Sequence, residues 1–145
     1  MKKYIIILIC TAVISSCNTN TKDKIAGDPA KALDMAMKSP TTVQMIDTMY
    51  NFGKVTEGEK VTYNYRFKNT GSKPLVIGKP FASCGCTVPE SPKEPILPGQ
   101  TGYIKVVFNS SGKGGIVRKT VTVPSNAEPV FPELVLTGEV IHAAK

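Results

Sequence analysis

The sequence of 145 residues contains no tryptophan and a single histidine, and these scarcities exclude several kinds of site. With only His142 available, the chain has no Ser-His-Asp set and no His-Glu-x-x-His metal motif. A glycine-rich phosphate loop and a matched pair of carboxylates on a cleft element are also missing. We therefore expect no enzymatic activity and no bound cofactor, and we interpret His142 as a solvated residue near the C-terminus.

Long runs of one charge are missing as well. The formal net charge is +7, but the positive residues are spread along the chain, and no five consecutive residues carry the same charge. Basic nucleic-acid-binding segments show such runs or clusters. We therefore expect no nucleic-acid partner.

The longest apolar run is too short to cross a membrane. It extends over eleven mostly apolar residues, Tyr4 to Ile14, whereas a membrane-spanning helix needs about 20. Lys2 and Lys3 precede this run and small residues follow it, which is the arrangement of a secretory signal peptide. We predict a signal peptide over residues 1–16 and export of the rest of the chain.

The end of this segment, Ile14-Ser15-Ser16-Cys17, resembles the lipobox of bacterial lipoproteins. The resemblance implies cleavage before Cys17 and attachment of lipid to Cys17, and the alternative is an ordinary secreted protein with a chance cysteine. Cleavage would leave 145 minus 16, or 129, residues, and loss of Lys2 and Lys3 would lower the net charge from +7 to +5. We expect a lipoprotein anchored to the membrane through Cys17 in the bacterial cell envelope, at the outer membrane, on its periplasmic face or the cell surface.

Residues 17–42 form a leader ahead of the folded domain. Its first part is polar, and Asp28-Pro29 then provides an N-cap and a first helical residue. Ala30, Leu33 and Met37 share one helix face, and Pro40 ends the pattern. We predict a lipid-anchored polar tether with a short helix, which either acts as a spacer or docks on the domain.

From residue 43 onward the apolar residues recur with a period of two, which is typical of half-buried strands. Alternation is clearest around Tyr65. Strands are predicted over Val43–Tyr50, Val61–Lys68, Leu75–Ile77, Phe81–Val88, Gly102–Asn109, Val117–Val123 and Leu134–Ile141. About seven short strands at hairpin spacing predict an all-β fold, an antiparallel β-sandwich of Greek-key type over residues 43–142, with a tail over 143–145. The lack of tryptophan and of a long-range cysteine pair argues against an antibody-type domain.

Cysteines are too few to hold this fold together. Of the four, Cys10 leaves with the signal peptide and Cys17 would carry lipid, which leaves Cys84 and Cys86 on either side of Gly85. An oxidising compartment outside the cytoplasm permits disulfides, but one such short loop adds little stability. The stability of the domain must therefore come mainly from a hydrophobic core.

The Cys84-Gly85-Cys86 segment is the one constellation with evident chemistry. Side chains at i and i+2 share a face of a strand, and a glycine between them makes the bend required by a disulfide inexpensive. A strained, easily reduced disulfide is our leading interpretation, and a reduced, half-buried pair is the second. A thiol-redox site, with Lys79 or Lys93 approaching in space, and a soft-metal site for copper(I) complete the alternatives.

Four prolines occur within ten residues, at Pro89, Pro92, Pro95 and Pro98. A segment so rich in proline cannot join the centre of a sheet, because each proline lacks a backbone N–H. We predict a rigid connection between the two sheets, or alternatively a fixed rim beside the cysteines.

Several other residues are predicted to have structural roles. Phe52, Phe67 and Phe108 are expected to fill the core. Asn69 and Asn126 follow strands or precede turns, and we expect each side chain to bond the backbone of its own turn.

A series of motifs in the domain resembles a known family. The motifs follow one another in the order Asn51–Val55 with Glu57–Glu59, Phe67–Leu75, Ser83–Pro89, Leu97–Gln100, Ile104–Phe108 and Ser125–Ala127. Over about Met45–Val140 the chain resembles the domain-of-unknown-function family 1573, a bacterial immunoglobulin-like family. The resemblance implies a sandwich related to major-sperm-protein and PapD-like domains, in a lipoprotein context, but no activity.

Two classes of function remain. In the first, the protein is a non-enzymatic, lipid-anchored interaction module that presents loops or an open strand edge to an envelope protein or a glycan. In the second, it is a thiol-redox or copper(I)-binding protein that uses Cys84 and Cys86. We favour the first, because the sequence contains no other chemical apparatus.

Overall fold

The structure of the chain is a computed structural model, and it describes residues 34–142. The predicted signal peptide (1–16), the lipidation site Cys17, most of the predicted helix and the tail (143–145) lie outside the described residues. These predictions are therefore carried forward as predictions.

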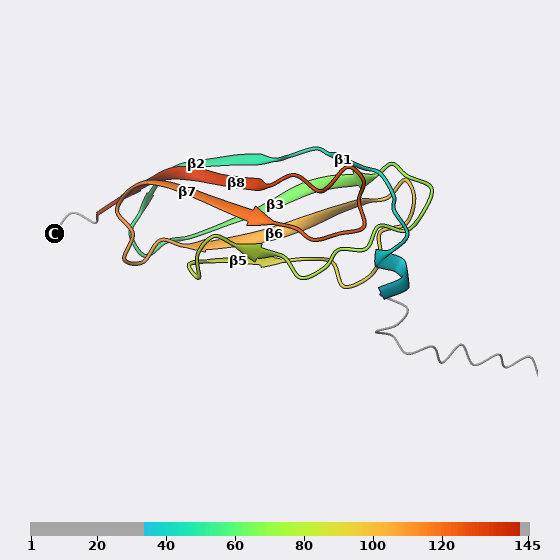
Figure 1. Cartoon of the computed structure of the whole chain (residues 1–145). Coiled ribbons are helices and arrows are strands. Elements are labelled where there is room, and N and C mark those ends of the chain that lie inside the picture. Colours follow the sequence, from blue (N-terminus) through green and yellow to red (C-terminus); the bar gives the residue numbers. More distant parts are fainter. Residues whose placement is uncertain (1–33, 143–145) are drawn as a thin grey trace, which may run out of the picture.

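The described residues form two four-stranded sheets packed face to face (Figure 1). One sheet has the strand order β1-β3-β6-β5 and the other has the order β2-β8-β7-β4. The strands are β1 (Val43–Met45), β2 (Met49–Thr56), β3 (Lys60–Asn69), β4 (Phe81–Ala82), β5 (Thr87–Glu90), β6 (Thr101–Asn109), β7 (Gly115–Thr122) and β8 (Leu134–Ile141). The predicted all-β, immunoglobulin-like sandwich is confirmed.

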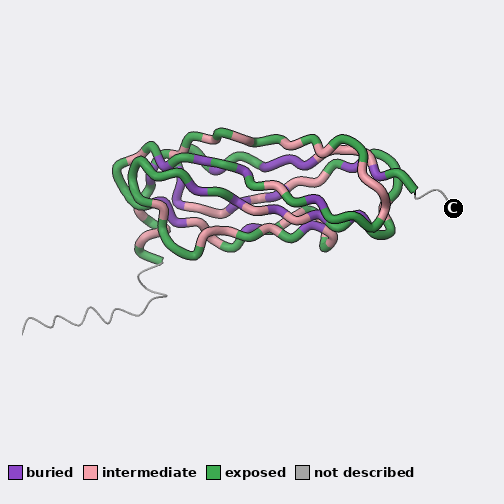
Figure 2. Tube along the Cα trace, turned by 180° about the vertical axis from the view of Figure 1, so that it is seen from behind, coloured by how far each residue is buried: buried purple, intermediate pink, exposed green. Residues whose placement is uncertain are grey.

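The core lies between the sheets and follows the alternation seen in the sequence. Buried and exposed residues alternate along β3 and β6, and Figure 2 shows the buried positions recurring along the strands. Phe67 and Phe108 are fully buried, as predicted, and each belongs to a separate apolar cluster. Phe52 is half-buried and stacks on Phe108 with ring centroids 5.8 Å apart.

The predicted first strand, Val43–Tyr50, divides into two strands that belong to different sheets. β1 pairs antiparallel with β3, whereas β2 pairs with β8 and runs parallel to it. The chain crosses between the sheets at Asp47, whose N–H donates to the Arg66 carbonyl at 3.2 Å. Arg66 in turn donates to the Asp47 carboxylate from Nε at 2.7 Å and from the guanidinium Nη2 at 3.2 Å. This ion pair holds the crossing against β3.

The ion pair at the crossing makes stability depend on pH. Hydrogen bonds from Arg66 hold the pKa of Asp47 below its usual value. A carboxylate with a lowered pKa stabilises the folded state at neutral pH, and this contribution is lost as the pH falls through the folded-state pKa. We expect acidification from about pH 5 to about pH 2 to lower the thermal midpoint more in the wild type than in Asp47→Asn. Circular dichroism melts of both proteins would measure this, and parallel curves would contradict it.

Two other predicted strands differ from the structure. Leu75–Ile77 forms only isolated bridges, from Leu75 to Ile96 and from Ile77 to Ser125. The predicted strand Phe81–Val88 is divided into β4 and β5, which belong to different sheets. The two cysteines therefore lie in a turn where the chain changes sheets, and not on a strand.

The chain enters the domain through a short helical turn over residues 34–37 at one end of the sandwich (Figure 1). Asn126 donates from Nδ2 to the carbonyls of Ala36 at 3.1 Å and Ser39 at 2.7 Å, so this segment is docked on the domain. Within residues 34–142 no helix is long and apolar enough to cross a membrane.

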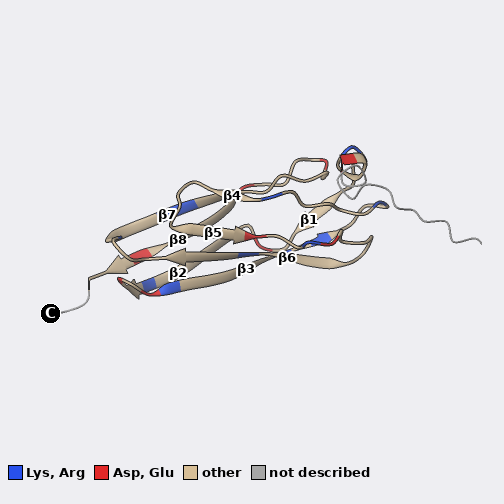
Figure 3. Ribbon diagram, turned by 90° about the horizontal axis from the view of Figure 1, so that it is seen from below, with Lys and Arg blue, Asp and Glu red and all other residues tan. Residues whose placement is uncertain are grey.

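Charged residues of both signs are distributed over the two sheets and their loops (Figure 3). Several pair across neighbouring strands, including Lys54 with Glu139 at 2.9 Å and Lys105 with Glu90 at 3.3 Å. Such exposed pairs contribute little to stability. Each charge in a pair is already balanced by its partner, so it is less available to a ligand.

Candidate functional site

Cys84 and Cys86 form a disulfide in the turn between β4 and β5, with their Cα atoms 5.4 Å apart. Residues two apart in a fully extended strand would lie about 6.5–7 Å apart, so the turn is what brings the pair within disulfide range. The expectation that the two side chains share a strand face is wrong, because the chain bends here to change sheets. Gly85 has neither a positive φ nor a neighbour within 4 Å of an added Cβ, so the bend does not require glycine.

The turn is held by Thr87 and by the adjacent strand. The Thr87 N–H donates to the Cys84 carbonyl at 3.2 Å, and the Asn109 N–H donates to the Cys86 carbonyl at 2.9 Å. Cys86 also packs against the apolar cluster that contains Phe108. Both cysteines are half-buried, so the disulfide lies at the surface with one side against the core.

The chemistry available at this turn is narrow. A disulfide offers no free thiolate to copper(I), and it exchanges only when an outside thiolate attacks one of its sulfurs. Among residues 34–142 no group of three or more His, Cys, Asp or Glu side chains is placed to hold a metal. His142 instead contacts Glu57, with Nδ1 2.7 Å from Oε2. Redox exchange and metal binding by the cysteines stay predictions.

Removing the disulfide should have a small effect on stability. The cysteines are two positions apart, and closing so short a loop removes little entropy from the unfolded chain, which corresponds to about 1.5 kcal/mol. We expect the double variant Cys84→Ser/Cys86→Ser to lose no more than about this amount in urea unfolding. Gly85→Ala, which keeps the disulfide, is the matched control. A loss of about 3 kcal/mol or more in the free energy of unfolding would instead show that the disulfide is important for the stability of the fold.

The proline-rich segment Ser91–Pro98, here called the proline strap, connects β5 to β6. These strands are neighbours in one sheet, so the predicted connection between sheets is wrong. The strap follows the last residue of β5, whereas the cysteines precede its first residue, so it does not form a rim beside them. Pro89 itself lies within β5.

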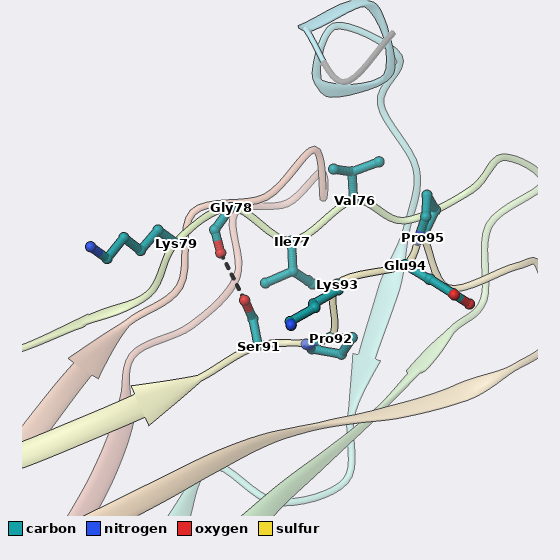
Figure 4. Close-up of a pocket in the computed structure, with 9 residues that line it drawn as sticks. All are labelled: Val76, Ile77, Gly78, Lys79, Ser91, Pro92, Lys93, Glu94 and Pro95. Atoms are coloured by element: carbon teal, nitrogen blue, oxygen red, sulfur yellow. Dashed lines mark hydrogen bonds between the residues drawn. The ribbon is translucent and has the colours of Figure 1, made fainter. Parts of the chain in front are cut away.

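A hollow of about 340 Å³, here called the strap groove, lies between the strap and the segment 76–79 (Figure 4). The two segments meet at Leu75 and Ile96, whose backbones exchange two hydrogen bonds of 2.9 Å. They meet again where Ser91 Oγ donates to the Gly78 carbonyl at 3.3 Å. The groove is lined by Val76, Ile77, Gly78, Lys79, Ser91, Pro92, Lys93, Glu94 and Pro95. Lys79 and Lys93 thus belong to this groove, and no hydrogen bond or ion pair within residues 34–142 links either to the cysteine turn.

A second hollow of about 440 Å³, here called the edge groove, lies on the other side of the strap, against β6. It exists because β5 pairs with β6 only as far as Glu90 and Lys105, while β6 extends back to Thr101. Its lining consists of Glu90, Ser91, Pro92, Ile96, Thr101, Gly102, Tyr103 and Lys105. No motif marked this groove in the sequence. The signal that could have indicated it is the proline spacing that forces the chain away from β6 after Glu90.

Two buried asparagines hold the segments that flank the strap groove. Asn69 donates from Nδ2 to the Ile96 and Lys73 carbonyls, each at 2.8 Å. Asn126 accepts from the Val76 N–H at 2.8 Å and donates to the Pro74 carbonyl at 3.1 Å. Asn69 bonds its own turn as predicted and also reaches across the fold, whereas the local role predicted for Asn126 is wrong.

The sequence profile of a family described as protein of unknown function, DUF1573, matches residues 43–140. The chain belongs to this family. The match includes both sheets, the cysteine turn and the strap, which confirms the resemblance seen in the motifs. No curated protein matches the chain at a significant level.

Solved structures support the same fold. A protein of unknown function from Porphyromonas gingivalis W83 superposes with a TM-score of 0.60 at 14% identity, over 70% of this chain and 47% of that one. The chain thus spans about half the length of the Porphyromonas protein. The PapD-like domain 7 of human CEP192 superposes with a TM-score of 0.51 at 11% identity, over 72% of this chain and 88% of that one. At these identities the likeness concerns the fold alone.

Proposed function

We propose that this protein is a non-enzymatic binding module whose strap end recognises another envelope protein. The observation that carries the proposal is the pair of grooves on either side of the proline strap. Prolines stiffen the strap, and the buried amides of Asn69 and Asn126 pin the segments around it. A preformed concave surface of this kind suits binding, because little conformational entropy is lost when a partner docks.

The proposal includes export and a lipid anchor on Cys17, at the outer membrane. The described chain enters beside Asn126, which also bonds the segment lining the strap groove. A tether attached there would hold the binding end near its membrane. The end of the sandwich at which β8 finishes lies on the side away from the tether (Figure 1). Cys17→Ala should release the protein from the membrane fraction. Unchanged membrane association of that variant would refute the anchor.

Site-specific crosslinking tests the binding module. A photo-crosslinking amino acid is placed at Lys93 in the strap, and at Ile116 as the matched control, since Ile116 is 92% exposed and lies on β7 in the other sheet. Irradiation of whole cells should yield a discrete crosslinked protein from position 93 that an excess of unlabelled protein suppresses. Equal patterns from both positions, or none from position 93, would count against the module.

The second candidate is a thiol-redox function of Cys84 and Cys86, or copper(I) binding after their reduction. It is favoured by one observation, a half-buried disulfide at the surface in a turn of only a few residues. Alkylation in denaturant with and without prior reduction, read by intact mass, reports the oxidation state of the pair. A reduction potential within the range of known thiol oxidoreductases would support exchange. Replacement of both cysteines by serine without any change in cellular phenotype or copper content would remove this candidate.

A further inference from the structure

We propose that the edge groove binds an extended, acidic segment of the partner protein as an added strand along β6. This inference rests on the proposed binding function and specifies its site and the chemistry of its ligand. Strand addition needs an open edge with unpaired backbone groups, room beside it, and side-chain contacts that select the ligand. The edge groove combines these three features.

The open edge is at Thr101 and Tyr103. The Asn109 N–H points toward β5, where it bonds Cys86, and the Gln100 carbonyl points toward β3, where it accepts from Asn69. Because backbone groups alternate sides along a strand, the odd-numbered residues of β6 face the β5 side. The β5 ladder ends at Lys105. Thr101 and Tyr103 therefore direct their N–H and C=O groups into the groove, where no strand formed by residues 34–142 lies opposite them.

The outer edges of the two sheets are less suited to addition. β1, with three residues, and β4, with two, also leave stretches of β3 and β7 without a neighbouring strand among residues 34–142, but the edge groove lies beside neither of these stretches. In β5 the backbone groups of Val88 face β6, because Val88 pairs with Val107, whose backbone groups face β5. The backbone of Pro89 therefore faces the outer edge, and proline has no N–H to offer there. In β2 the register is broken around Gly53, which has a φ of 72° and an N–H already bonded to Asn51 Oδ1. A proline or a broken register discourages edge pairing in natural sheets, and the short open edge of β6 at Thr101–Tyr103 has neither.

The groove also offers contacts that an extended segment would use. Ile96 and Pro92 provide apolar surface, and Tyr103, 57% exposed, stands on the outward face of β6 beside them. A strand bonded to Thr101 and Tyr103 would continue the line that β5 leaves after Glu90. Alternate side chains of such a strand would face Ile96 on one side and solvent on the other.

Charge selects an acidic segment. Lys68 is exposed and lies directly opposite Thr101 on the neighbouring strand. Lys105 is paired with Glu90, and Arg66 with Asp47, whereas Lys68 makes no ion pair within residues 34–142. The added strand would lie on the side of β6 away from β3, so a carboxylate beside Thr101 would reach this cation across the short Thr101 side chain. An exposed pair across one intervening strand contributes modestly to affinity, and it favours acidic over basic ligands.

A matched pair of substitutions at Thr101 tests the inference. Thr101 is the first residue of β6, where proline is tolerated, and its N–H is not used in the pairing with β3. Thr101→Pro removes the N–H that faces the groove, while Thr101→Ala keeps it. The probe is a set of peptides selected from a phage-displayed random library on the full chain in detergent, with a scrambled peptide as control. We expect enrichment of Asp or Glu, affinity reduced about tenfold by Thr101→Pro, and a change within about twofold for Thr101→Ala.

A second measurement does not depend on the variants. In the wild type, a bound peptide should slow hydrogen exchange at the Thr101 and Tyr103 amides, and Lys68→Glu should weaken the acidic peptides about fivefold. Selected peptides that protect other amides, or bind Thr101→Pro unchanged, would overturn the site. Peptides without acidic enrichment would overturn the ligand chemistry. Failure to select any peptide, or Thr101-dependent self-association, would overturn the inference, while crosslinking at position 93 still reports separately on the binding module.

Discussion

Replacing Asn126 with alanine should lower the free energy of unfolding by about 3 kcal/mol or more. The side chain is 5% exposed and makes four hydrogen bonds, to the Val76 N–H and to the carbonyls of Ala36, Ser39 and Pro74. Alanine would leave the buried Val76 N–H without its partner and would remove one hydrogen bond from each of the three part-buried carbonyls. An unpaired buried group costs about 1–3 kcal/mol, and the weaker losses at the carbonyls add to it. Urea unfolding of the wild type and the variant measures the difference.

Two controls separate the role of Asn126 from a general effect of losing an amide. Asn51→Ala removes an exposed side chain with one local bond, to Gly53 N, and should change stability by less than about 0.5 kcal/mol. Asn126→Asp keeps the shape but cannot donate to the three carbonyls, so it should destabilise at least as much as alanine. A mild Asn126→Asp effect would mean that these carbonyls find other partners.

Truncating Phe67 should have a comparable or larger effect, about 3–5 kcal/mol. The ring is fully buried and packs edge-on against Phe131, with centroids 5.3 Å apart. It also fills the space left by Gly102, where an added Cβ would lie 2.6 Å from the Phe67 Cζ atom. Because these neighbours belong to β6 and to the loop between β7 and β8, which are held by their own sheet contacts, the cavity left by alanine cannot easily collapse.

Phe81→Ala is the matched control for Phe67→Ala. Phe81 is 58% exposed on β4, so its loss removes little buried surface and should change stability by less than about 1 kcal/mol. Chemical denaturation at a fixed pH compares the two. Similar losses for both variants would mean that the apolar cluster around Phe67 is less closely packed than its burial indicates.

The predictions connect stability to the proposed binding surface. Asn69 and Asn126 are both core residues and supports of the strap groove. Asn69→Ala or Asn126→Ala should therefore loosen the segments around the strap, whereas Phe67→Ala acts on the interior between the sheets. A variant that folds but leaves the strap groove mobile would show reduced crosslinking at position 93, while its circular dichroism spectrum would still be that of a β-sheet protein.

Local patterns predicted the long strands well. The alternation of large apolar and polar residues located β3, β6, β7 and β8, with β8 correct to the residue. Such alternation is a direct consequence of one face of a strand lying against the core. It can therefore be recognised from residues that are close together in the sequence. The same reasoning identified Phe67 and Phe108 as core residues.

Elements whose identity depends on distant partners were predicted less well. Val43–Tyr50 reads as one strand because it is mostly apolar and no glycine or proline interrupts it, yet Asp47 contacts Arg66 and the chain crosses to the other sheet there. Leu75–Ile77 has the composition of a strand but reaches only isolated bridges, because its neighbours are irregular loops pinned by Asn126 and Asn69.

The sequence by itself determined the all-β class, the main strands, the core phenylalanines, the family motifs and the presence of one cysteine pair. Only the tertiary structure decided which sheet each strand joins, that the cysteines lie in the turn between sheets, and that the strap diverges from β6 to leave an open edge at Thr101 and Tyr103. The division has a physical reason. Burial of one strand face is recorded in local periodicity, whereas pairing, crossing and groove formation depend on hydrogen bonds between residues far apart in the chain.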